Sequence, residues 1–278
     1  MKIKKSDFHL SPVLKYVFVY LGIILIIIPI ANIFMSGFKT TGEINRVLSF
    51  PSSFYLENYK KVFTSYYVMG SFVNSAIITS ATIILNVILC SLAAYSLARR
   101  REKIFGFMYY FFLSAMMIPA VANLSTLYSI VITLGLKDTR TALILIYSAL
   151  QVPMGILLYT GFIKTLPRQL DEAAKIDGCN YLQAFIKVIS PLLKPVTASY
   201  AVITVIFVWN DFLMPLMIIN SQEKKPLTLA VYSFVSEHAA DYGAIYAMLI
   251  VAMIPPIVLF LVSQKYFYKG ITMGAVKG

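Results

Sequence analysis

Residues 16–35 read Y-V-F-V-Y-L-G-I-I-L-I-I-I-P-I-A-N-I-F-M and contain no charged side chain. A helix needs about 20 mostly apolar residues to cross the hydrocarbon core of a bilayer. This segment is long enough to span a membrane once, and it therefore predicts an integral membrane protein.

Apolar segments of similar length recur along the chain. A further short apolar segment, 124–136, is too short to cross, so we expect an interfacial or partly buried helix there. The sequence predicts an all-α integral membrane protein with six transmembrane helices. The other predicted spans are 71–97, 104–122, 141–163, 196–219 and 243–266.

The composition supports a membrane protein without a separate soluble domain. The chain is 59% hydrophobic and 13% charged, and its mean hydropathy is +0.78, whereas soluble domains are about 25% charged. We expect a cytoplasmic N-terminus over 1–15 and a single transmembrane domain over 16–278. That domain includes a polar loop at 164–195 and a C-terminal tail at 267–278.

Lysine and arginine residues predict the orientation. With a cytoplasmic N-terminus, sixteen of the 24 basic residues fall on the cytoplasmic side, as the positive-inside rule requires. Both termini and the loop 164–195 are then cytoplasmic, and the cluster Arg99–Arg101 is the strongest anchor. The net charge of +12 lies at span ends, where it meets lipid headgroups, so we expect no nucleic-acid partner.

The loop 164–195 carries signals for two short helices. Pro167 suits a first helical turn, Glu172 lies early in that helix, and Gly178 is a stop signal. The first helix is predicted at 168–177. A helix with a small alanine face and a flanking carboxylate suits insertion into a cleft of another protein, but it equally suits a simple connection between two spans.

A second helix is predicted from Asn180 to about Ser190, because its apolar residues recur at helical spacing. Pro191 and Pro195 are expected to end it and to lead into the next span.

This loop resembles the EAA motif of the membrane subunits of binding-protein-dependent ABC importers. The motif reads E-A-A-x-x-D-G, followed by Phe, Ile and Pro at fixed offsets. The resemblance implies that the first helix is a coupling helix, which docks in a groove of an ATPase subunit. The matching residues are Glu172, Ala173, Ala174, Asp177, Gly178, Phe185, Ile189 and Pro191.

Nearly the whole chain resembles carbohydrate-type permeases of that family. Trp209-Asn210-Asp211-Phe212 is typical of them, although Glu is commoner than Asp211. The ending 270–278 resembles the second, smaller membrane subunit of maltose-type importers and implies a type I ABC importer fold. It also implies that the tail contacts the ATPase dimer through Gly274, Val276, Lys277 and Gly278.

The resemblance implies a set of partners. They are a second, homologous permease subunit, two ATPase subunits, an extracellular solute-binding protein and a sugar, in the plasma membrane of a prokaryote. The chain has no G-x-x-x-x-G-K-[ST] phosphate loop, no H-E-x-x-H motif and no Cys/His cluster. We therefore expect no enzyme activity, metal site or cofactor in this chain, with ATP and Mg²⁺ bound by the ATPase subunits.

Uncharged polar and aromatic residues in or beside the spans could line a sugar pathway. They equally suit hydrogen bonds between helices, and Asp211 also suits a kink before Pro215. The candidates are Asn74, Asn123, Tyr128, Gln151, Trp209, Asn210 and Asp211.

Two other functions stay open at this point. One is an ABC permease for a non-sugar ligand, such as glycerol phosphate or a peptide. The other is an ATP-independent carrier or channel. Asp211 is the one acidic residue within a predicted span, and ion-coupled carriers usually need several ionisable groups at depth.

Overall fold

The computed structural model describes residues 12–238 and 241–275, and every regular element in this part is a helix. Single-turn segments are η1 (Ala115–Met117), η2 (Ala120–Asn123), η4 (Gln222–Lys224) and the π-helical η3 (Phe185–Ile189). In chain order the helices are α1 (Pro12–Ser36), α2 (Glu57–Thr64), α3 (Tyr66–Arg99), α4 (Lys103–Ser114), α5 (Leu124–Thr133), α6 (Arg140–Thr165), α7 (Gln169–Ile176), α8 (Tyr181–Ala184), α9 (Ser190–Leu192), α10 (Lys194–Asn210), α11 (Leu213–Ile218), α12 (Leu227–Glu237) and α13 (Tyr242–Ala275).

These helices form two compact units. The first comprises the described residues up to Ser65 together with Phe234–Val251. The second comprises Tyr66–Ser233 together with the described residues from Ala252 onward. The boundaries fall within α12 and α13, so each of these helices contributes to both units.

In the first unit, Asn58 of α2 holds the chain that follows α1. Its buried side-chain amide donates hydrogen bonds to the carbonyl oxygens of Gly37 and Lys39, at 3.0 and 2.9 Å. A Cβ atom at Gly243 would lie 2.6 Å from the same amide nitrogen, so α13 can approach α2 here because residue 243 has no side chain. Lys61 of α2 also pairs with Asp241, with 2.5 Å between Nζ and Oδ2.

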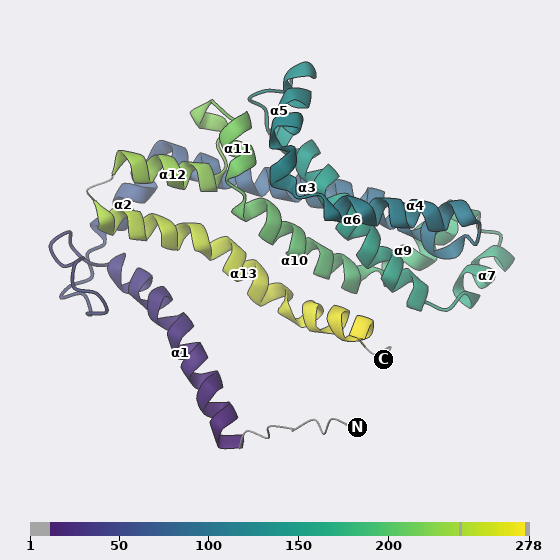
Figure 1. Cartoon of the computed structure of the whole chain (residues 1–278), viewed down its shortest axis with the longest axis horizontal. Helices are drawn as coiled ribbons and strands as arrows, with labels where there is room; N and C mark the ends of the chain where they lie inside the picture. The colour runs from purple at the N-terminus through teal and green to yellow at the C-terminus, as the bar shows by residue number, and fades with distance from the viewer. Residues whose placement is uncertain (1–11, 239–240, 276–278) are drawn as a thin grey trace, which may run out of the picture. The chain divides into compact units, whose positions relative to one another are not determined.

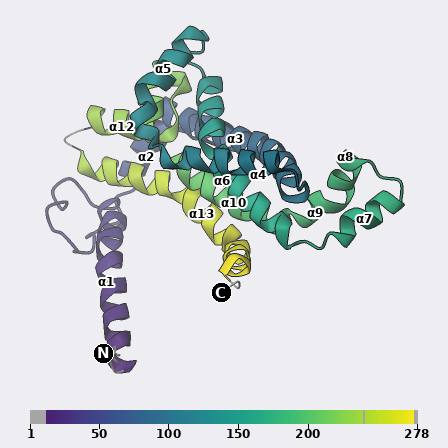
Figure 2. The same ribbon diagram turned by 45° about the vertical axis from the view of Figure 1, so that its right-hand side comes forward.

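In the second unit, α3, α6 and α10 run side by side, as Figures 1 and 2 show. The three helices meet at Gly155 of α6. A Cβ atom there would lie 2.6 Å from Cys90 Sγ and 3.3 Å from Tyr200 Cε2. The absence of a side chain at this position therefore permits close packing of all three helices.

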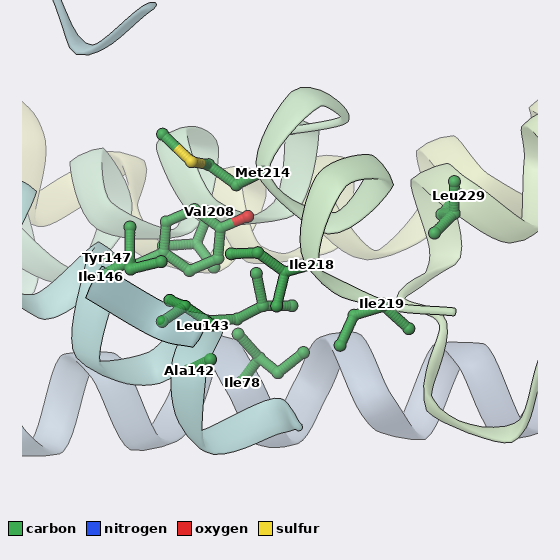
Figure 3. Packing of buried hydrophobic residues seen from close by; sticks show 11 residues of the cluster. Ile78, Ala142, Leu143, Ile146, Tyr147, Val208, Met214, Ile218, Ile219 and Leu229 are labelled. Atoms are coloured by element: carbon green, nitrogen blue, oxygen red, sulfur yellow. The ribbon is translucent and has the colours of Figure 1, made fainter. Parts of the chain in front are cut away.

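A cluster of buried apolar side chains joins α6 to α11 and to the end of α10 (Figure 3). Leu143 and Tyr147 of α6 are among its most buried members, with 0% and 1% of their surfaces exposed. The cluster fixes the position of the segment that follows α10. Its other members are Ile78, Val131, Ala142, Ile146, Val208, Met214, Ile218, Ile219 and Leu229.

Three described helices are long and apolar enough to cross a membrane: Tyr16–Ser36, Tyr67–Arg99 and Arg140–Thr165. Two bent pairs, Lys103–Met117 with Ala120–Thr133 and Tyr181–Leu192 with Lys194–Asn210, raise the number to five if each pair counts as one span. The predicted all-helical membrane architecture is thus confirmed, with three to five candidate spans by length and composition.

The single helix predicted at 104–122 is wrong. The chain leaves the α-helix after Ser114 and turns by 88° before Ala120–Thr133. Pro119 explains the break, because a residue before proline is pushed out of the helical region, and Ile118 has φ −90° and ψ 115°. The short helix predicted at 124–136 is confirmed as α5.

The single helix predicted at 196–219 is also interrupted, because α10 ends at Asn210 and α11 starts at Leu213. Pro215 has no N–H to donate to the carbonyl oxygen of Asp211, four residues earlier. Thr228 Oγ1 donates to that oxygen instead, at 2.7 Å. The carbonyl oxygen left without an N–H donor at this break is therefore paired with a side chain of α12.

Candidate functional site

The segment α7–α9 lies at one end of the bundle formed by α3, α6 and α10 (Figures 1 and 2). The helix predicted at 168–177 is confirmed as α7. Its residues divide into two faces. Leu170, Asp171 and Ala174 are partly or fully buried, whereas the opposite face is exposed.

The buried face of α7 is bound to the end of α3 by polar contacts. Tyr95 donates a hydrogen bond from its hydroxyl to Asp171 Oδ1, at 2.5 Å. Arg99 Nε lies 2.9 Å from Asp171 Oδ2, and Arg99 Nη1 donates to the carbonyl oxygen of Leu166, at 3.1 Å. Most of the Arg99 and Asp171 side chains is buried, with 8% and 14% exposed.

The exposed face of α7 consists of Gln169, Glu172, Ala173, Lys175 and Ile176. Ile176 is 86% exposed, although it is a large apolar residue. Glu172 has no hydrogen-bond or ion-pair partner among residues 12–238 and 241–275. An apolar side chain beside a free carboxylate on a convex helix face is suited to contact with another protein.

Gly178 ends α7 in a left-handed conformation, with φ +78°. The Gly178 N–H donates to the carbonyl oxygen of Lys175, and the Cys179 N–H donates to that of Ala174, at 3.0 and 2.9 Å. These are the two bonds of a Schellman motif, which favours glycine because other residues are strained at this φ. The predicted role of Gly178 as a helix stop is confirmed, and the adjacent Asp177 is exposed.

The second predicted helix of the loop begins as expected but ends differently. Asn180 and Gln183 form a capping box at the start of α8, and Phe185 and Ile189 are buried. Pro191 does not end the helix, because it lies inside α9. The preceding turn η3 is π-helical, with the Ser190 N–H bonded to Phe185 O, and this wider turn accommodates the missing donor of Pro191.

The aromatic side chains of this loop pack onto α3 as well. The Tyr95 ring stacks on Tyr181, with 4.5 Å between ring centroids, and it contacts the Phe185 ring at 5.3 Å. Tyr95 and Arg99 were not among the site residues predicted from the sequence. Their pairing with Asp171 joins positions far apart in the chain, which helical periodicity does not reveal.

The predicted tail contacts fall mostly beyond the described residues. Gly274 belongs to the last turn of α13. Val276, Lys277 and Gly278 lie outside the described residues.

The predicted pathway residues do not gather at one site. Asn74 is buried and donates to the carbonyl oxygens of Glu223 and Lys225, at 2.8 and 3.0 Å. Trp209 is buried and forms a T-shaped contact with Phe72, with 5.6 Å between ring centroids. Both have structural partners within the bundle.

The remaining candidates also have different surroundings. Gln151 is buried, and Asn123 lies half-buried where η2 meets α5. Tyr128 accepts a hydrogen bond from Lys137 Nζ, at 2.9 Å. Asn210 is exposed and donates to Ile206 O of its own helix, at 2.8 Å.

A cavity of about 150 Å³ lies among η2, α6, α10 and α11. Its walls are mainly apolar and include Tyr147, Phe207 and Asp211. Asp211 is the one predicted pathway residue that lines this cavity. Its carboxylate accepts hydrogen bonds from the Tyr147 hydroxyl and the Met214 N–H, so it caps the helix break, as its position before Pro215 allowed.

Several known proteins are similar to this chain. The melibiose/raffinose/stachyose import permease protein MelC of Bacillus subtilis is 36% identical over 90% of this chain and 91% of its own length. The multiple sugar-binding transport system permease protein MsmG of Streptococcus mutans is 36% identical over 95% of this chain and 96% of its own.

The fold is similar to that of a chain from the crystal structure of a bacterial ABC transporter involved in the import of the acidic polysaccharide alginate. The TM-score is 0.81 with 22% identity, over 96% of this chain and all of that chain. Residues 86–273 match the family described as the binding-protein-dependent transport system inner membrane component. The chain belongs to this family of transporter membrane subunits.

Proposed function

We propose that the protein is the membrane-spanning permease subunit of an ATP-driven, binding-protein-dependent importer of sugars, with oligosaccharides as the transported ligands. It forms half of the translocation pathway. MelC and MsmG, which match almost the whole chain, are both named as permeases for sugars. The same reasoning favours a sugar over glycerol phosphate or a peptide as the transported ligand.

The proposed topology has six spans, with both termini on the cytoplasmic side of a prokaryotic plasma membrane. Three long helices, the bent pair Lys103–Met117 with Ala120–Thr133, α10 with α11, and α13 supply these spans. The excess of basic residues at the cytoplasmic ends supports this orientation. The region from residue 16 to residue 278 is then one transmembrane domain with a cytoplasmic loop at 164–195.

The proposed coupling element is the exposed face of α7. The observation that carries the proposal is that Glu172, Ala173 and Ile176 point away from the bundle, while Asp171 and Ala174 secure the opposite face. This face enters a groove of an ATPase subunit, which supplies the energy because it binds ATP and Mg²⁺. The C-terminal residues 274–278 form a second contact with the ATPase dimer.

The complete transporter contains partners besides the ATPases. A second, homologous permease completes the pathway, and an extracellular solute-binding protein delivers the sugar. Closure of the two ATPase subunits on ATP moves both coupling helices and rocks the permeases between inward-facing and outward-facing states.

Charge reversal at the exposed face tests this proposal. We expect Glu172→Lys to release the ATPase during co-purification while the permease still inserts in the membrane. Glu102→Lys is the matched control, because Glu102 is exposed outside α7. Gly178→Val should also weaken ATPase binding, since valine is strained at the φ of Gly178. Normal ATPase retention and transport in both α7 variants would disprove the coupling role.

A further inference from the structure

The Asp171 side chain links α7 to a helix that is not its neighbour in sequence. Backbone connects α7 directly to α6 and, through α8 and α9, to α10. The link to α3 consists of side-chain contacts instead. A displacement of α7 reaches α6 and α10 through the chain, whereas the direct contact of α7 with α3 consists of Asp171 and the residues around it.

The contact between Asp171 and α3 combines one hydrogen bond with one largely buried ion pair. Both carboxylate oxygens face α3, since Oδ1 accepts from the Tyr95 hydroxyl and Oδ2 lies 2.9 Å from Arg99 Nε. Little of the Arg99 and Asp171 side chains reaches solvent, so water and salt screen this pair less than an ion pair at the surface. Removing one partner would leave the other charge largely buried and uncompensated.

Neighbouring contacts stiffen the same end of α3. The Tyr95 ring is packed by Tyr181 and Phe185, so the hydroxyl that binds Asp171 is held in place. The Arg100 guanidinium lies over the Phe105 and Tyr181 rings, with Cζ 5.1 and 5.6 Å from their centroids. The last turn of α3 is thus held by α8 and η3 as well as by α7.

We propose that Asp171 and Arg99 are a positioning pair that makes α3 follow α7 during the transport cycle. This inference rests on the proposed function. Asp171 lies on the buried face of α7, whereas the proposed ATPase-facing residues Glu172 and Ile176 lie on its exposed face. Because α3 is a single helix of 34 residues, a displacement at its end is carried along its full length.

The first test compares transport with ATP hydrolysis in proteoliposomes that contain the permease, its partner permease, the ATPases and the binding protein. Raffinose is the probe, chosen because MelC is named as a raffinose permease. We expect Asp171→Asn to retain the ATPase and its basal hydrolysis, yet to lower the raffinose transported per ATP by about tenfold. Asp171→Glu should keep most of the coupling, because it retains the charge.

The matched control is Glu102→Gln, which neutralises an exposed acid near the same end of α3 and should leave the ratio unchanged. An unchanged ratio in Asp171→Asn overturns the proposal. So does a loss of transport that accompanies loss of the ATPase from the complex, because the pair would then serve only the fold of α7.

The second test measures the distance between α3 and α7 without any sugar. Spin labels are placed at Ile84→Cys and Lys175→Cys, both exposed positions, in a Cys179→Ser background. The distance should be the same in the nucleotide-free and ATP-bound, vanadate-trapped complexes, and it should change between these states when Asp171→Asn is added. A nucleotide-dependent change without that substitution contradicts the proposal.

Failure of the proposed function can be distinguished from failure of the positioning role of Asp171 and Arg99. Absence of any ATPase from the unsubstituted complex overturns the proposed function, and the positioning role with it. An unsubstituted complex that couples ATP hydrolysis to transport, and is unaffected by Asp171→Asn, overturns the positioning role alone.

Discussion

The Tyr147 hydroxyl on α6 donates a hydrogen bond to Asp211 Oδ2 at the break between α10 and α11, with 2.7 Å between the oxygens. The same Oδ2 accepts from the Met214 N–H at 3.2 Å, and the Asp211 carbonyl accepts from Thr228. These contacts come from three separate elements. At the break before Pro215, the Oδ2 atom and the carbonyl oxygen of Asp211 are therefore both hydrogen-bonded. Asp211 also lines the cavity.

Tyr147→Phe tests the contribution of this hydrogen bond to stability. A hydrogen bond to a charged group contributes about 2 kcal/mol, so we expect the free energy of unfolding to fall by about that amount. Thermal unfolding of the purified protein in detergent measures the change. Tyr110→Phe is the matched control, because Tyr110 is 70% exposed. Equal melting temperatures for the two variants would show that the Tyr147–Asp211 bond is not significant for stability.

Gly155→Ala tests the close packing of α3, α6 and α10. The new Cβ would approach Cys90 Sγ to 2.6 Å and Cys90 Cβ to 2.9 Å. Such overpacking costs about 1–3 kcal/mol, and it should lower the melting temperature. Gly161→Ala lies on the same helix with no atom within 4 Å, so this control should be neutral or stabilising. A higher melting temperature for Gly155→Ala than for Gly161→Ala would contradict the close packing at Gly155.

The two alanines of the motif should respond differently to the same substitution. Ala174 is 3% exposed, so Ala174→Arg forces a charge into the contact between α7 and the bundle and should destabilise the permease. Ala173 lies on the exposed face, so Ala173→Arg should leave the melting temperature unchanged but prevent ATPase binding. Thermal unfolding and co-purification separate the two effects, and identical behaviour would argue against the two-faced helix.

Asp138 gives a prediction for the dependence of stability on pH. Its carboxylate accepts from the Ser221 hydroxyl, the backbone N–H groups of Ser221 and Asn220, and Lys224 Nζ. These donors, led by the Ser221 hydroxyl, hold the pKa of Asp138 well below its ordinary value. The stabilisation is therefore present above about pH 4 and is lost as the pH falls toward the lowered pKa.

Asp138→Asn should lower the stability by about 1 kcal/mol at neutral pH. Asparagine also tolerates the positive φ of 58° at this position, so the substitution isolates the charge. Melting temperatures from neutral pH down to below about pH 4 provide the measurement. The difference between the two proteins should shrink as the pH falls, and a constant difference would exclude the carboxylate as its source.

Much of the fold could be predicted from apolar segment length. The spans containing α1, α3 and α6 follow from uncharged runs, and α7 follows from its start and stop signals. The breaks at Ile118 and Asp211 were harder to predict from the sequence, because the apolar pattern continues across them. Proline is tolerated in membrane helices when other groups satisfy the freed carbonyl, as Thr228 does here, and such partners are distant in sequence.

The candidate site at α7 could also be predicted only in part from the sequence. The motif identified α7, but it could not separate Ala173 from Ala174, since the pattern carries no information on which face meets the bundle. Arg99 was assigned to membrane orientation, whereas it also pairs with Asp171. A pair of charges far apart in the chain depends on how α3 and α7 pack, which local spacing does not encode.

Reconstituted uptake tests the central claim most directly. The permease, co-expressed with its partner permease and ATPases, is placed in proteoliposomes with ATP at the ATPase side and binding protein at the other. The account predicts accumulation of a sugar such as melibiose or raffinose only when ATP and the binding protein are both present. Accumulation by this chain alone without ATP, or ATP-driven uptake of glycerol phosphate or a peptide in place of every sugar tested, would contradict it.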